Sequence, residues 1–174
     1  MESSESLPRV FEKVMVTGHR PQGLTEEQAA FAKRALMACG RQLKRDFGTV
    51  EAISGMALGV DTWWAMAALN LKLELAAYIP FPQQSDPWSP TDQFRWTKLR
   101  EKANREVVCG EEFSVRMLHV RNDAMIKDAD LAIAVWSPSQ LRGGTASAVQ
   151  KIRKRGMPMI LIDLDALFIS RENF

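Results

Sequence analysis

Cysteine is scarce in this sequence of 174 residues. The two cysteines, Cys39 and Cys109, lie far apart and match no spacing of metal ligands, so no metal site is expected. Both are expected to be reduced and at least partly buried, which suits a cytoplasmic protein. A metal-dependent function is therefore not indicated.

Long apolar stretches, targeting signals and internal repeats are also lacking. No apolar run approaches the roughly 20 residues that span a bilayer, so no membrane partner is expected. Residues 1–6 are polar and acidic, unlike a secretory or mitochondrial signal, and residues 1–9 are predicted to form a disordered tail. Hydrophobic residues make up 46% of the chain, so residues 10–174 are predicted to form a single domain.

Net charge is small. The formal value of +2 does not by itself imply a nucleic-acid or membrane partner. The basic residues between Lys151 and Arg155 stand at the end of a predicted helix, before Gly156 and Pro158. Because cations favour the carboxyl end of a helix, this cluster is explained without nucleic acid.

Strand and helix patterns alternate along the chain. Short apolar runs typical of buried parallel strands are separated by segments with helical spacing of apolar residues. This order predicts an α/β fold with a mostly parallel sheet of about six strands and helices on both faces. The strands are predicted at 13–17, 50–54, 74–80, 106–109, 131–136 and 159–163, and the helices at 26–46, 60–71, 92–105, 117–128 and from Arg142 to about 155. Residues 164–174 are expected to pack back on the domain as a tail.

Turns that contain glycine follow three of the predicted strands, at 17–20, 54–59 and 142–145. In a parallel sheet they emerge at the same edge, where open α/β sheets bind ligands. Each offers backbone N–H groups and a hydroxyl, and Arg20 and Arg142 add guanidinium groups that can grip phosphate. Turn geometry alone would explain one such turn, but three together predict a ligand that carries phosphate.

Two common nucleotide-binding motifs are missing. The first turn has one glycine instead of G-x-G-x-x-G, and there is no Walker A sequence, so an ordinary nicotinamide site is not supported and no cofactor is expected. Trp63 and Trp64 are most simply core residues, with adenine stacking as the less favoured alternative. The proline-rich segment 80–90 is expected to be an extended loop at the ligand edge, which either covers a ligand or is an inert connection. Whether Trp88 or Trp136 lines the site is left open.

Five ordered segments resemble the SLOG superfamily, closest to its YpsA/YspA-like branch: VTGHRP at 16–21, SGMALGVD at 54–61, RNDAMI at 121–126, DLAIA at 130–134 and GGT at 143–145. The resemblance covers about residues 14–163. The superfamily includes the LOG phosphoribohydrolases, the DNA-processing protein A family and nucleotide-sensing domains. It implies a Rossmann-like, doubly wound fold and a nucleotide or nucleotide-derived ligand. The turns and the matching segments together predict these ligand-binding residues: Thr17, Gly18, His19, Arg20, Ser54, Gly55, Met56, Gly59, Asp61, Arg121, Asn122, Gly143, Gly144 and Thr145.

An N-glycosidic hydrolase of the LOG type is one functional alternative. The LOG motif P-G-G-x-G-T-x-x-E resembles residues 142–148, but Ala148 stands where the motif has glutamate, which argues against that mechanism. The remaining candidates for acid–base chemistry are Asp61, Asp123, His19 and His119.

Each of these candidates also has a simpler interpretation. Asp61 stands at the start of a helix, where a carboxylate is more often a cap. His19 could orient a phosphate or a sugar hydroxyl without moving a proton, and Asp123 could pair with Arg121 or Arg20. Catalytic residues are therefore left unassigned.

The favoured hypothesis is a module that senses or sequesters a nucleotide, because it requires only the phosphate cradle. Hydrolysis comes second. Single-stranded DNA binding comes third, because the charge is near neutral and no basic stripe with interleaved aromatics is present. The identity of the nucleotide and the presence of a homo-oligomer are left open.

Overall fold

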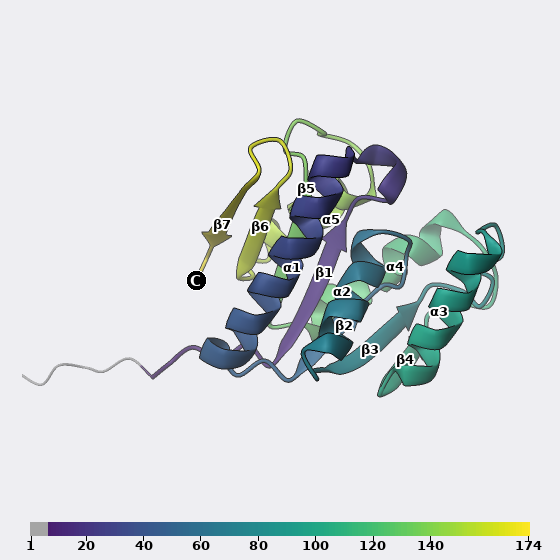
Figure 1. Cartoon of the computed structure of the whole chain (residues 1–174), viewed down its shortest axis with the longest axis horizontal. Helices are drawn as coiled ribbons and strands as arrows, with labels where there is room; N and C mark the ends of the chain where they lie inside the picture. Colours follow the sequence, from purple (N-terminus) through teal and green to yellow (C-terminus); the bar gives the residue numbers. More distant parts are fainter. Residues whose placement is uncertain (1–6) are drawn as a thin grey trace, which may run out of the picture.

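A seven-stranded sheet forms the centre of the molecule in the computed structural model, which describes residues 7–174 (Figure 1). Residues 1–6 of the predicted disordered tail lie outside the described residues. The strands are β1 (Lys13–Gly18), β2 (Glu51–Ser54), β3 (Glu74–Ile79), β4 (Arg105–Val108), β5 (Leu131–Trp136), β6 (Met159–Asp163) and β7 (Phe168–Glu172). They lie in the order β4-β3-β2-β1-β5-β6-β7.

The sheet is parallel except at one edge. β7 pairs antiparallel with β6, with Met159 opposite Glu172. The prediction of a mostly parallel sheet is confirmed, but the sheet has one strand more than the six expected, because the segment predicted as a packed tail contains β7. A short connection allows two neighbouring strands to pair antiparallel, whereas the parallel neighbours need a crossover helix.

Helices cover both faces of the sheet. The helices α1 (Glu26–Phe47), α2 (Val60–Asn70) and α3 (Pro90–Lys102) lie in front of it in Figure 1, and α4 (Val115–Asp128) and α5 (Gly144–Lys154) lie behind it. A short 3-10 helix, η1 (Pro21–Gly23), follows β1. Within residues 7–174, no helix is both long enough and apolar enough to cross a membrane.

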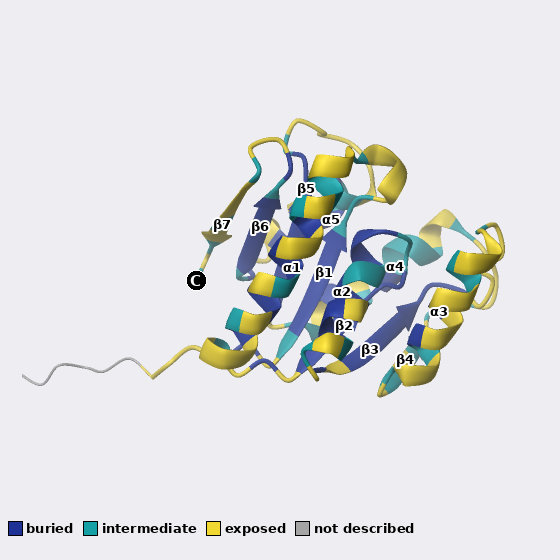
Figure 2. Ribbon diagram, viewed as in Figure 1, coloured by how far each residue is buried: buried dark blue, intermediate teal, exposed yellow. Residues whose placement is uncertain are grey.

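Alternating side chains of the strands build two core layers, and β1, β2, β3, β5 and β6 are mostly buried in Figure 2, whereas the edge strand β7 is mostly exposed. Val14 and Val16 of β1 pack with α1 and α2, whereas Met15 between them packs with α4 and α5. β5 is buried along its whole length, as a continuous apolar run predicts for a strand covered on both faces.

The start of α1 illustrates how the sequence fixes a helix end. The Gln28 backbone N–H donates to Thr25 Oγ1 at 3.1 Å, and the Thr25 N–H donates to Gln28 Oε1 at 3.0 Å. This is the predicted capping box. The helix ends at Gly48, whose φ of 67° lies in the left-handed region that glycine tolerates.

The strand order reverses between β1 and β5. From β1 the chain builds β2, β3 and β4 on one side, and it then returns to build β5 and β6 on the other. In doubly wound sheets, a crevice forms at this point outside the carboxyl ends of the strands. The fold therefore places the turns after β1 and β5 side by side.

A charged network that the sequence did not predict ties the amino-terminal edge of the sheet to the end of α4. Arg105 donates to Glu51 Oε1 at 2.6 Å and to Asp128 Oδ2 at 2.5 Å. Asp128 also accepts from Lys13 Nζ at 2.9 Å and from the Tyr78 hydroxyl. Desolvation alone would raise the pKa of Asp128, but the hydrogen bonds from Tyr78, Lys13 and Arg105 outweigh it and lower the pKa to about 2.

We expect Asp128→Asn to reduce the loss in the free energy of unfolding as the pH falls from about 4 towards 2. The pKa of Asp128 is lower in the folded protein than the value of about 3.9 in an unfolded chain, so the ionised form stabilises the fold above about pH 4. That stabilisation, roughly 1–2 kcal/mol after solvent screening, is lost as the pH falls towards 2. Urea unfolding of both proteins between pH 2 and 6 measures it. Asp86→Asn, at an exposed residue with no ion pair among the described residues, is the control and should keep the wild-type slope.

Candidate functional site

A cavity of about 730 Å³ opens at the carboxyl ends of the parallel strands. It lies at the point where the strand order reverses. Five segments line it: the end of β1 with its turn, the start of α2, the loop after β3, the residues from Phe113 into α4, and the start of α5. The lining residues are Val16, Thr17, Gly18, His19, Arg20, Ala57, Asp61, Phe81, Gln83, Gln84, Pro87, Trp88, Phe113, Val115, Leu118, His119, Arg121, Asn122, Gly143, Gly144 and Thr145.

The amino-terminal end of α5 lies open at the cavity. No side chain caps it, whereas α1, α3 and α4 are capped by Thr25, Ser89 and Ser114. A Cβ atom added at Gly143 or Gly144 would meet nothing within 4 Å. Unpaired N–H groups and the positive end of the helix dipole make such a helix end suitable for an anion. The space above these glycines is therefore available to a ligand.

A buried guanidinium forms part of the cavity wall. Arg121 of α4 is only 8% exposed, and its Nη1 donates to the Gly55 carbonyl oxygen at 2.7 Å. Its Nε donates to Asn122 Oδ1 at 3.1 Å, and its Nη1 lies 4.0 Å from Asp61 Oδ2. Asp61 is thus close enough to offset the charge but too far away for a hydrogen bond.

Asp61 is fixed from its own helix turn. Its Oδ2 accepts from the Ala57 N–H at 3.2 Å, so it braces the turn before α2. It does not cap the helix as expected, because the N-cap of α2 is Gly59 and no side chain caps this helix end. Burial raises the pKa of the Asp61 carboxyl, and the Arg121 guanidinium and the Ala57 N–H oppose that shift. A Cβ at Gly55 would come within 2.8 Å of Asp61 Oδ2 and 2.9 Å of Arg121 Cζ, so this pair requires glycine there.

The turn after β2 supports the cavity and lines it only through Ala57. Ser54, Gly55, Met56 and Gly59, all predicted as ligand-binding residues, are buried and do not line the cavity. The Met56 N–H donates to Ser54 Oγ at 3.1 Å, and Ser54 Oγ donates to the Asp61 carbonyl oxygen at 2.7 Å. These polar groups are used inside the turn, and Gly55 turns its carbonyl oxygen towards Arg121.

The turn after β1 places four predicted residues on the cavity wall: Thr17, Gly18, His19 and Arg20. A Cβ at Gly18 would lie 2.5 Å from Val60, so tight packing on α2 requires this glycine. Arg20 is exposed, and its guanidinium makes no hydrogen bond within residues 7–174, although its carbonyl oxygen accepts from the Gly23 N–H at 3.2 Å. It is therefore free to bind a ligand.

His19 is held as a neutral ring. Its Nε2 accepts from the Ser137 N–H at 3.2 Å, so the hydrogen of the neutral ring lies on Nδ1. Burial lowers the pKa of His19, and the nearby Asp165 carboxylate only partly opposes this. His119, the other histidine of the chain, also lines the cavity.

Other predicted candidates lie away from the cavity. Asp123 accepts from Lys151 Nζ at 2.6 Å, rather than pairing with Arg121 or Arg20 as considered from the sequence. Arg142 is exposed and outside the lining.

The tryptophans also differ in whether they line the cavity. Trp64 is fully buried and donates to the Val14 carbonyl oxygen at 3.3 Å, and neither it nor Trp63 lines the cavity, so adenine stacking by these two residues is not supported. Trp88 lines the cavity and Trp136 does not.

Sequence reasoning missed the apolar part of the lining. Phe81, Phe113, Val115 and Leu118 belong to no motif, and they come from the connections after β3 and β4 and from α4. The available indication was the expected position of the loop 80–90 at the ligand edge. Within residues 7–174, no group of three or more His, Cys, Asp or Glu side chains could hold a metal ion.

Solved structures with a similar fold include two DNA-processing proteins. DNA processing protein A from Streptococcus pneumoniae is 20% identical with a TM-score of 0.63, over 87% of this chain and 50% of that chain. The protein of the same name from Helicobacter pylori, described as binding single-stranded DNA, is 21% identical with a TM-score of 0.61, over 88% of this chain and 65% of that chain. This chain thus spans less than two-thirds of the length of either protein.

A third similar structure is the molybdenum cofactor binding protein from Rippkaea orientalis. It is 17% identical with a TM-score of 0.56, over 90% of this chain and 77% of that chain. Identities this low show a shared fold and not a shared activity. No curated protein sequence matches the chain.

The sequence itself matches the model of the YspA SLOG family over residues 14–167. This match confirms the resemblance inferred from the ordered motifs. It runs from the first strand to the residue before β7 and so includes every segment that lines the cavity. The chain therefore belongs to the YspA SLOG family.

Proposed function

We propose that this protein binds a nucleotide or a nucleotide-derived ligand through its phosphate, as a sensor or a sequestering module. The observation that carries the proposal is the open amino-terminal end of α5 at Gly143 and Gly144, in the same cavity as Arg20 and Arg121. The helix end supplies N–H donors, and the two guanidinium groups supply charge and bidentate geometry.

The charge balance of the cavity favours an anion. Arg20 and Arg121 line it together with one end of a helix dipole, and Asp61 is the single carboxylate among its lining residues. Arg121 is buried, and Asp61 Oδ2 lies 4.0 Å from its Nη1 without a hydrogen bond, so a phosphate in the cavity would add acceptors and negative charge close to the guanidinium.

Binding explains the site better than hydrolysis does. Ala148, at the position of the LOG glutamate, is a buried residue of α5 and offers no carboxylate. Asp61 is occupied by the Ala57 N–H and lies beside Arg121. Single-stranded DNA and the molybdenum cofactor, as ligands of structurally similar proteins, support ligand binding on this fold by analogy only.

Gly144→Asp should abolish nucleotide-induced thermal stabilisation while leaving the fold intact. The carboxylate would occupy the phosphate position and repel it, but the new side chain meets no protein atom within 4 Å at Cβ. The free energy of unfolding should change by less than about 1 kcal/mol, because an acidic residue is favourable in the first turn of a helix. Thermal-shift measurements with a nucleotide panel check this. Gly23→Asp, with equally open space but outside the cavity, should keep the wild-type response.

Arg20→Ala should lower the affinity for phosphorylated ligands about tenfold or more, and it should lower the affinity for the matching nucleosides much less. The reason is the loss of charge-assisted hydrogen bonds to phosphate. Calorimetric titration of the two ligand classes measures the difference. Arg34→Ala is the control, since Arg34 of α1 is an exposed arginine outside the cavity. Equal losses of affinity for nucleotide and nucleoside would show that Arg20 does not bind the phosphate.

No free base should appear when the protein is incubated with nucleoside monophosphates. A module that only binds lacks the carboxylate that the LOG motif supplies, as Ala148 shows. Chromatography of the reaction mixtures detects released base. Base released by the wild-type protein and not by Asp61→Asn would instead establish a hydrolase.

A further inference from the structure

The end of the cavity away from α5 is aromatic and apolar. Phe81 and Trp88 come from the loop after β3, and Phe113 and Val115 come from the segment after β4. Phe113 is 69% exposed and Val115 is 62% exposed, although both line the cavity. Phe113 packs edge-to-face on Phe81, with ring centroids 5.2 Å apart. A cavity wall that leaves large apolar side chains open to water is suited to an apolar group of a ligand.

The strand order separates this wall from the proposed phosphate site at Arg20 and the start of α5, which we call the phosphate cradle. Neighbouring strands lie about 4.8 Å apart. β3 is two strands from β1, which leads to Arg20, and three strands from β5, which leads to Gly144. The loop after β3 therefore begins about 10–14 Å from the cradle, before side chains narrow the gap. Inorganic phosphate can occupy only one end, whereas a phosphate joined to a ring through a sugar can reach both.

The loop after β3 is held in place by hydrogen bonds. The buried Gln84 donates from Nε2 to the Gly55 carbonyl oxygen at 3.0 Å, and its Oε1 accepts from Trp96 Nε1 at 3.0 Å. Gln93 of α3 donates to the carbonyl oxygens of Ser85 and Asp86 at 3.2 and 3.0 Å. These bonds attach the loop both to the turn that holds Arg121 and to α3. The wall is therefore formed before a ligand arrives, which lowers the entropy cost of binding.

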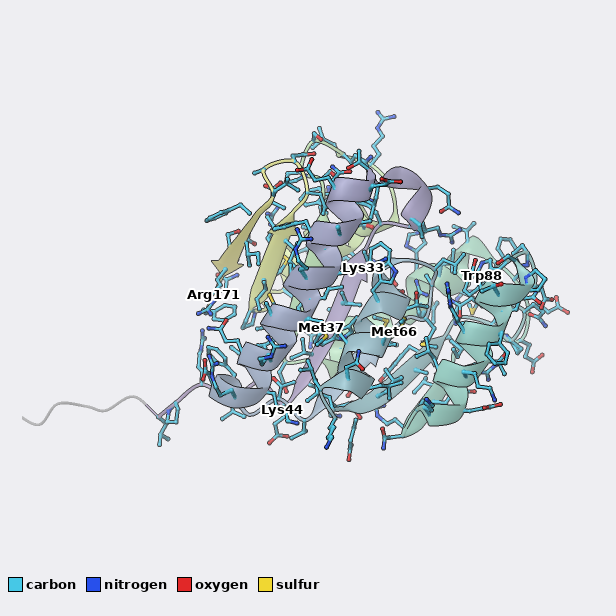
Figure 3. All side chains as sticks on the ribbon, in the orientation of Figure 1. Lys33, Met37, Lys44, Met66, Trp88 and Arg171 are labelled. Carbon is cyan, nitrogen blue, oxygen red and sulfur yellow. The ribbon has the colours of Figure 1, made fainter. Side chains whose placement is uncertain are left out.

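Trp88 is fixed within this loop. Its ring packs edge-to-face on Trp96, with centroids 6.4 Å apart and an interplanar angle of 86°. Figure 3 labels it beside the first part of α3, at the edge of the sheet where the parallel strands end. It is the single tryptophan among the cavity-lining residues, and it is only half-buried.

We propose that Trp88 and Phe113 form a ring-binding subsite for the aromatic base of a nucleotide whose phosphate lies at α5. This inference rests on the proposed function and assigns the second half of the cavity. It names the ligand class as a phosphate ester that carries a planar ring, rather than a sugar phosphate. The proline-rich loop after β3 is then a recognition element and not an inert connection.

Calorimetric titration of the full chain with inorganic phosphate, ribose 5-phosphate and the four ribonucleoside 5′-monophosphates tests the subsite. The wild-type protein should bind at least one nucleotide about tenfold or more tightly than ribose 5-phosphate, because stacking of one base contributes a factor of this order. Trp88→Ala should lose most of that preference and keep its affinity for ribose 5-phosphate. Trp88→Phe should keep the preference in part. Phe94→Ala, at an exposed aromatic residue of α3 outside the cavity, should bind as the wild type does.

Tryptophan fluorescence gives an independent measurement if Trp88→Ala folds poorly. Nucleotide should change the emission of the wild-type protein, ribose 5-phosphate should not, and Trp88→Phe should lack the change. A wild-type protein that binds ribose 5-phosphate as tightly as every nucleotide would overturn the ring subsite but leave the phosphate cradle standing. An undiminished preference in Trp88→Ala would do the same. Absence of binding by all six compounds would overturn the proposed function together with the subsite.

Discussion

The buried guanidinium of Arg121 is surrounded by oxygen atoms of neighbouring residues, as a cation removed from water requires. The Gly55 carbonyl oxygen accepts from Arg121 and also from Gln84 of the loop after β3. Asp61 brings the opposite charge from α2 without a direct hydrogen bond. One buried guanidinium thus fixes the turn after β2, the start of α2 and the loop after β3 relative to α4. Because Asp61 lies 4.0 Å away without a hydrogen bond, an anion that enters the cavity can still interact with this guanidinium.

α4 is held by charged groups at its middle and at its last turn. Arg121 anchors the part near the cavity, and Asp128 anchors the last turn through Arg105 and Lys13 at the opposite edge of the sheet. Between these points, Met125 packs into the apolar layer against the sheet. With its middle and its last turn fixed, α4 cannot shift along the sheet without breaking hydrogen bonds to charged groups, which are among the stronger ones in proteins. The cavity wall that α4 contributes is therefore a stable feature of the fold.

The three turns contain glycine for different physical reasons. At Gly18 and Gly55 a side chain would collide with Val60 or with the Asp61–Arg121 pair, so these glycines serve packing. At Gly144 a side chain would meet only open space, and packing does not require glycine there. A motif alone cannot separate these cases, because each glycine follows a strand in the same way. The difference identifies the start of α5 as the place where the chain leaves room for something other than itself.

Sequence patterns predicted six of the seven strands, the five α-helices, the parallel orientation of those six strands, and the position of the turns after β1 and β5 at one edge of the sheet. Apolar periodicity, caps and chain order carry that information because they act between near neighbours or through general rules of connection. The folded structure was needed to show that β7 joins the sheet, that Asp123 pairs with Lys151, and that the turn after β2 presents a carbonyl oxygen to Arg121. It also decided that Trp88 lines the cavity. These outcomes depend on contacts between residues far apart in the chain, such as Gln84 with Gly55, and no local pattern encodes which distant partner a polar or aromatic side chain will find.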